Sequence, residues 1–200
     1  MITERRSREL SLLTFDEKKS IGALSFLCSL GKGGIDHYFA AKLMYLFDRA
    51  MLLRTGTPAF FGKYYALPWG PIVSQVNDGI KSCNPMGEER SKNWSDYFSL
   101  DQNSHKVTFS DQTNAERYEN LLSGEEENVL TDIYNELSRL TRPQLVSYIQ
   151  NLPEHISVKS GRKDMSYEFV LRANGFSEEE TKEIIDELEY EDEFRALSLN

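Results

Sequence analysis

The chain of 200 residues is 40% apolar and 12% aromatic, which suits one folded domain, with or without an appendage, and argues against a wholly disordered protein. All of its net charge of −9 falls on residues 164–200, which hold twelve of the 32 acids and three of the 23 bases. The remainder of the chain is neutral, so it lacks the excess of basic residues expected for nucleic-acid binding. The two cysteines, Cys28 and Cys83, are too few and too far apart to suggest a disulfide framework or a zinc site, which favours a reduced cytoplasm.

Two helices are predicted at the start of the chain. Thr14 and Glu17 form a capping-box pattern that would open the first helix, with Thr14 as its N-cap. The glycine-rich residues 31–34 would end it. The second helix is predicted to begin near Asp36, to carry a broad apolar face, and to end at residues 55–58.

The middle of the chain predicts short extended segments and a third helix. Residues 59–67 are aromatic and indicate a short strand or extended connection. Pro71 suits the first position of a helix, where its missing N–H is no loss. A polar loop over 84–92 then leads to extended segments at 94–100 and 105–109, whose linking residues are typical turn formers and predict a β-hairpin.

Most of residues 110–152 are predicted to be helical. A weak helical pattern covers 110–122, and Ser123 begins a capping box for a helix with a clear apolar stripe. A further short helix is predicted to start at Thr141 and to end before Pro153. The predicted fold class is α+β and mainly α, a compact helical domain with a small antiparallel β-hairpin or three-stranded sheet.

The C-terminal residues predict a linker followed by helices. The linker covers residues 155–163, a short helix covers 166–174, and Ser177 caps a last, acidic helix. On residue pattern alone this helix is the best candidate for a partner surface, because acids such as Glu187 and Glu191 would attract a basic surface. Its apolar side either packs on the domain or enters a partner groove.

The most specific motif of the chain lies between residues 42 and 73. A helical K-L-M-Y at 42–45, followed by Asp48, precedes the aromatic run 64–66 and a W-G-P turn at 69–71. That order resembles the Panacea domain, the SocA-like and GepA-like antitoxin family of bacteria and their phages. Members carry a K-L-L-Y-type helix with an acidic residue, an aromatic strand and a W/Y-G-P turn, so Met44 departs from the usual leucine.

A second part of the family pattern follows further along the chain. An L-S-x-x-E-x-x-x-L helix over 122–130 and a Pro-Glu end at 153–154 also match it. The resemblance covers roughly residues 20–155. We therefore expect a Panacea-like domain over 14–155, and a linker with an acidic helical extension over 156–200.

The polar residues of the motif helix are candidate partner-binding residues, and three alternatives stay open for them. Lys42, Tyr45 and Arg49 share one helical face, and Asp48 is a close neighbour of Tyr45. Periodicity favours a solvated face with local ion pairs. The resemblance supports a recognition surface instead, and the third alternative is a structural network that fixes the helix against the 69–71 turn.

The turn itself has two interpretations. Trp69 could anchor a partner, since tryptophan is common among the residues that dominate binding. A tryptophan in a tight turn is more often a half-buried plug over the core, so we take Trp69 first as a determinant of the fold. Gly70 gives the turn backbone freedom and Pro71 suits a helix start, so both are expected to determine the fold.

Nothing in the sequence forms a recognisable catalytic or metal site. His37, His105 and His155 lack metal-ligand spacing, and the G-K-G-G at 31–34 is not a P-loop. The acids at 125–127 lie in a first helical turn, where they favour the helix dipole. We expect no enzyme, no metal and no cofactor, and no apolar run approaches the ~18–20 residues of a membrane helix.

The resemblance implies an antitoxin of a bacterial or phage toxin–antitoxin system. Such a protein neutralises a cognate toxin, toxic small alarmone synthetases among them, by direct protein–protein binding. One alternative is a proteolytic adaptor that delivers a toxin to a Clp-type protease, a role associated with one branch of the family. The other is a DNA-binding regulator with the hairpin as a wing, against which the neutral body and acidic tail argue. The sequence leaves the oligomeric state and the identity of the toxin open.

Overall fold

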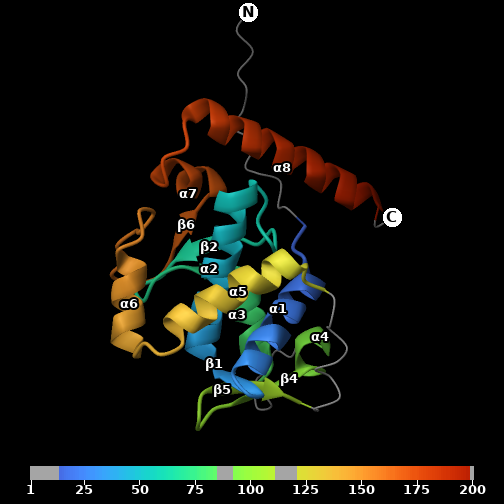
Figure 1. The fold of residues 1–200 in the computed structure, drawn as a ribbon, viewed down its shortest axis with the longest axis vertical. Helices are drawn as coiled ribbons and strands as arrows, with labels where there is room; N and C mark the ends of the chain where they lie inside the picture. Colours follow the sequence, from blue (N-terminus) through green and yellow to red (C-terminus); the bar gives the residue numbers. More distant parts are fainter. Residues whose placement is uncertain (1–13, 85–91, 111–120, 199–200) are drawn as a thin grey trace, which may run out of the picture.

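The computed structural model of the protein describes residues 14–84, 92–110 and 121–198, which form a mainly helical α+β fold (Figure 1). The predicted fold class is therefore confirmed, with two small three-stranded sheets in place of one. In chain order the elements are α1 (Glu17–Leu30), β1 (Gly34–Asp36), α2 (His37–Thr55), β2 (Tyr64–Ala66), β3 (Ile72–Val73), α3 (Ser74–Ser82), α4 (Lys92–Ser95), β4 (Phe98–Asp101), β5 (Lys106–Phe109), α5 (Gly124–Leu137), α6 (Arg142–Gln150), β6 (Lys163–Met165), α7 (Tyr167–Ala173) and α8 (Glu178–Ser198).

Helix α2 is the central element of the fold. Every residue from Ala40 to Asp48 is buried, because α1, α3, α5 and α7 pack around it. Asp36 caps its start by accepting hydrogen bonds from the N–H groups of Tyr38 and Phe39 at 3.0 and 3.1 Å. Gly56 ends it in the left-handed conformation. Both predicted ends of this helix are confirmed.

The two antiparallel sheets lie at different places around α2. The first has the order β1-β5-β4 and lies at the end of the molecule opposite α8 (Figure 1). The second has the order β3-β2-β6, so it joins the strand after α2 to a strand that lies about a hundred residues later in the chain. Residues Tyr64 and Ala66 of β2 pair with Met165 and Lys163 of β6.

The start of α1 differs from its prediction. Asp16, not Thr14, is the N-cap, and its carboxylate accepts from the N–H of Lys19 at 2.9 Å. Glu17 does not reach back to the cap because its carboxylate accepts a hydrogen bond from the indole of Trp94 at 3.0 Å. A tertiary contact has therefore replaced the local capping box.

The start of the third helix also differs from its prediction. Pro71 does not open α3, because Ile72 and Val73 pair with Tyr65 and Tyr64 as strand β3 before the helix begins at Ser74. Two β-branched residues next to an available strand gain ladder hydrogen bonds that a helix start would not give them.

Other boundaries shift or lie outside the described residues. Trp94 belongs to the short helix α4, and the predicted hairpin forms from 98–101 and 106–109. Strands β1 and β6 are not among the predicted elements. The predicted loop 84–92 and helix 110–122 fall largely on residues 85–91 and 111–120, outside the described part of the chain.

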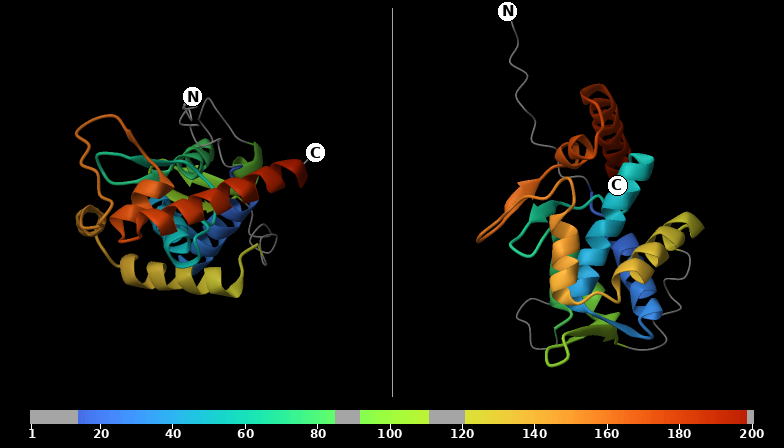
Figure 2. Two further views of the ribbon diagram at one scale, coloured as in Figure 1. Left: turned by 90° about the horizontal axis from the view of Figure 1, so that it is seen from above. Right: turned by 60° about the vertical axis from the view of Figure 1, so that its left-hand side comes forward.

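Helix α8 lies across one end of the molecule (Figure 2). Leu188 is buried against the domain, and Ile184 and Ile185 pack on the core. Asp192 accepts a hydrogen bond from the N–H of Thr14 at 2.5 Å, which joins the helix to the segment before α1. Within the described ranges, no helix is long and apolar enough to cross a membrane.

Candidate functional site

The polar residues of the motif helix point into the fold. Lys42, Tyr45 and Asp48 are 2%, 0% and 0% exposed, and the Arg49 side chain is 14% exposed. In this conformation their polar groups bind other parts of the chain, so they form a buried network along α2. Partner contact through these residues stays a prediction.

Lys42 binds the backbone of the W-G-P turn. Its ammonium donates to the carbonyl oxygens of Gly70 and Pro71 at 2.7 and 2.9 Å, and it lies 5.4 Å from the centre of the Tyr38 ring. Burial lowers the pKa of Lys42 to about 7. A buried cation that donates to two carbonyls on one turn fixes that turn against α2.

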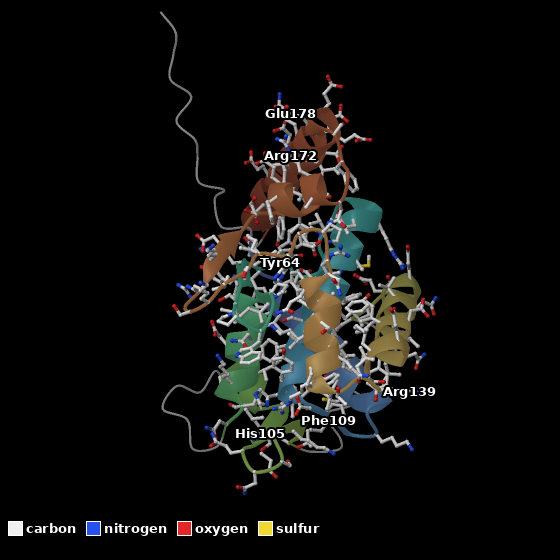
Figure 3. All side chains as sticks on the ribbon, turned by 90° about the vertical axis from the view of Figure 1, so that its left-hand side faces the viewer. Tyr64, His105, Phe109, Arg139, Arg172 and Glu178 are labelled. Atoms are coloured by element: carbon white, nitrogen blue, oxygen red, sulfur yellow. The ribbon has the colours of Figure 1, made fainter. Side chains whose placement is uncertain are left out.

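Asp48 binds the chain just before β2 and β2 itself. Its two oxygens accept from the N–H of Phe60 at 2.6 Å and the hydroxyl of Tyr64 at 2.8 Å. The Tyr64 ring meets those of Tyr45 and Tyr167 edge to face, at 5.1 and 4.8 Å. Figure 3 places Tyr64 midway between the two ends of the molecule. Burial raises the pKa of Asp48 to about 7, although both hydrogen bonds act in the opposite direction.

Glu154 completes the network at Tyr45 and Arg49 of α2. Its carboxylate accepts from the Tyr45 hydroxyl at 3.0 Å, from the Arg49 guanidinium at two points, and from the Asn174 amide at 3.0 Å. Burial opposes ionisation of Glu154, but the hydrogen bonds from Arg49 and Asn174 outweigh it and lower its pKa. This cluster ties α2 to the segment after α6 and to the end of α7.

The sequence did not identify Glu154 and Asn174 as site residues. The sequence did contain a feature that could have identified Glu154, since the Pro-Glu end at 153–154 belongs to the family pattern. No feature of the sequence could have identified Asn174. An Asn next to Gly175 is typical of a helix end, and the residue that binds it, Arg49, lies 125 positions away.

The pH dependence of stability is expected to report on Asp48. Between pH of about 4 and 7, folded Asp48 keeps its proton whereas the unfolded carboxyl releases it, so stability falls as the pH rises. Relative to Asp48→Asn, the wild type should lose up to about 1.4 kcal/mol of unfolding free energy per pH unit in this window. Urea unfolding of both proteins from pH 4 to 8 measures the difference. If the difference in unfolding free energy between the wild type and Asp48→Asn does not change with pH, folded Asp48 is ionised. The same holds if the difference grows in favour of the wild type as the pH rises.

Trp69 differs from the buried network beneath it. The residue is 66% exposed, whereas its backbone is held by the Tyr38 hydroxyl, which donates to its carbonyl at 3.1 Å. The N–H of Gly70 donates to the carbonyl of Leu67 at 2.9 Å, which closes the turn. The half-buried plug that we gave as one interpretation of Trp69 is therefore wrong, because the fixed turn holds the indole in solvent.

The acidic candidates lie apart from the network. Glu187 and Glu191 are exposed on α8, near the exposed Tyr190. Helix α8 packs against the C-terminal end of α2, where Ile184 lies close to Gly56. Lys42 is fourteen residues before Gly56 and Arg49 is seven, so the two ends of the network lie about 20 Å and about 10 Å from this contact along α2.

The comparisons with known proteins agree with the motif. A family model described as "Antitoxin SocA-like, Panacea domain" matches residues 41–156, more than half of the chain. No curated protein and no solved structure matches the chain significantly. The matched span begins one residue before Lys42 and ends two residues after Glu154, so it encloses the α2 network except for residues of α7. Among the described residues, no group of three or more His, Cys, Asp or Glu could hold a metal ion.

Proposed function

Because the chain belongs to the SocA-like Panacea antitoxin family, we propose that it is the antitoxin of a bacterial or phage toxin–antitoxin system. It neutralises a cognate toxin, a toxic small alarmone synthetase being one candidate, by direct protein–protein binding. The family match over residues 41–156 carries this proposal. No substrate is turned over in this mechanism, so the protein acts by the surface it presents.

The distribution of polar groups supports a binding role. The groups whose pKa values are most displaced, such as Lys42 and Asp48, are enclosed and already bonded to other parts of the chain. They therefore serve to fix neighbouring segments rather than to meet a substrate. The groups that reach solvent include the Trp69 indole and the acids of α8, which suit contact with another protein.

The test is co-expression with the product of the adjacent reading frame. That product alone should arrest growth, and this chain should restore growth and co-purify with it as a stable complex. Restored growth without a complex, lost in a host that lacks Clp-type protease, would favour the proteolytic adaptor. A harmless neighbour that forms no complex would contradict the antitoxin proposal.

The acidic helix is proposed to guide association with the toxin. Neutralising two exposed acids in Glu187→Gln/Glu191→Gln should slow association by about 2–10-fold at low salt, because the pair would no longer attract a basic surface. Stopped-flow mixing at two or more salt concentrations measures this, and the effect should shrink at high salt.

A matched control separates position from net charge. Glu125→Gln/Glu136→Gln removes two exposed acids from α5 instead of α8 and should leave the association rate unchanged. Equal slowing by both double variants would contradict a specific role for α8 and assign the effect to overall charge.

A further inference from the structure

Two loops leave the second sheet at the same end. Strand β2 ends at Ala66, which pairs with Lys163, the first residue of the antiparallel strand β6. The turn after Ala66 and the segment before Lys163 must therefore start side by side. Both views of Figure 2 show these two loops projecting together from the body of the molecule. The W-G-P turn and residues 155–162 thus share one end of the sheet.

The turn presents its tryptophan in a fixed position. Four hydrogen bonds hold the backbone at 69–71: two from Lys42, one from Tyr38 and one that closes the turn. The underside of the turn rests on α6, since a Cβ added at Gly70 would lie 2.6 Å from Ile149. A large side chain on a rigid backbone loses little conformational freedom when it is buried by a partner.

The same end of the sheet is basic in a chain of net charge −9. Lys159, Arg162 and Lys163 are exposed, and Asp164 is the exposed acid beside them. The guanidinium of Arg162 lies 4.4 Å from the centre of the Tyr65 ring, which holds the charge on the outward side of the sheet. The strand that leads to the turn thus has a cation over its Tyr65 ring, and the surplus of exposed basic residues at this end of the sheet favours a partner of the opposite charge.

We propose that this end of the sheet, the Trp69 face, docks the toxin, with the Trp69 indole entering an apolar pocket whose rim is acidic. The Trp69 face comprises Tyr65, Trp69, Lys159, Arg162 and Lys163. The inference rests on the proposed function and names the surface that performs it. The charge of the face favours an acidic partner and disfavours a symmetric pairing of two such faces, which would set like charges against each other.

Fluorine NMR tests the contact directly. The chain has two tryptophans, of which Trp69 is 66% exposed and Trp94 is 1% exposed. Protein grown with 5-fluorotryptophan therefore gives two signals, which Trp69→Phe assigns. The probe is the unlabelled product of the adjacent reading frame, made by cell-free synthesis. On adding it, the Trp69 signal should shift and lose its solvent isotope effect, while the Trp94 signal stays in place.

Variants give the energetic test. Trp69→Ala should weaken binding of that product by about 30-fold or more, and Arg162→Glu by about 10-fold. Tyr190→Ala, which removes a 73% exposed aromatic side chain from α8 but leaves Glu187 and Glu191 in place, is the matched control. The proposed role of α8 belongs to these charges, so this variant should bind as the wild type does. The melting temperatures of all three variants should equal that of the wild type, since each altered side chain is exposed.

The outcomes separate the two proposals. If the wild type binds the product and Trp69→Ala binds equally well, the Trp69 face is overturned and the antitoxin function stands. If the wild type neither binds the product nor restores growth, both fail together. A Trp69 signal that shifts with protein concentration alone overturns the toxin as the occupant and assigns the face to a second copy of this chain.

Discussion

Replacing Arg49 by methionine is expected to lower the free energy of unfolding by about 3–5 kcal/mol, one of the two largest effects that we predict. The substitution keeps much of the side-chain volume but leaves the Glu154 carboxylate buried without its cation. Asn174 and Tyr45 would still donate to Glu154, but neither carries a charge. Urea unfolding followed by circular dichroism measures the change, provided that the slope of the transition stays the same.

Arg142→Met is the control for this prediction. Arg142 forms an ion pair with Asp36 at 2.6 Å, but half of its side chain is exposed. Exposed pairs contribute about 0–1 kcal/mol, so its replacement should barely change stability. A loss at Arg49 no larger than that at Arg142 would contradict the view that the Arg49–Glu154 pair is a buried element of the fold.

Replacing Gly70 by alanine is expected to cost about 2–5 kcal/mol of unfolding free energy, for two separate reasons. Its φ of +94° lies where a side chain adds about 1–2 kcal/mol of strain. The new methyl group would also lie 2.6 Å from Ile149, and overpacking of this kind costs about 1–3 kcal/mol. Thermal and urea unfolding measure the sum.

Gly175→Ala separates the two contributions. Gly175 has nearly the same φ, +93°, but its added Cβ would meet nothing within 4 Å. It should therefore show only the strain, and the excess loss at Gly70 measures the contact with α6. Equal losses at the two glycines would mean that the turn can move away from α6 at little cost, which would also weaken the argument that Trp69 is held rigidly.

These two predictions concern different halves of one network. Arg49 and Glu154 join α2 to the segment after α6, whereas Lys42 and Gly70 join α2 to the turn that carries Trp69. The fold therefore uses buried polar contacts to fix the turn that carries Trp69. A binding surface fixed in this way loses less entropy when the partner binds.

The sequence alone determined the elements whose signals are local. The capping box of Ser123 and Glu126 marks the start of α5, and its return bond forms at 2.8 Å. Asp36 begins α2 and Gly56 ends it, as their residue types predict. In each case the hydrogen bonds concerned join residues within about four positions, so the residues that make them can be identified in the sequence. The motif at 42–45 and 69–71 likewise identified the family without a structure.

Only the tertiary structure decided which long-range partners these segments find. Strand β6 exists because β2 lies beside it, and Ile72 forms a strand rather than a helix for the same reason. The periodicity of α2 could not show that Asp48 is buried, because a polar residue is buried only where the fold supplies its donors, here Phe60 and Tyr64. The stretch of α2 from Ala40 to Asp48 is enclosed and has no solvent face for Lys42 or Asp48, and that enclosure is a property of the whole fold.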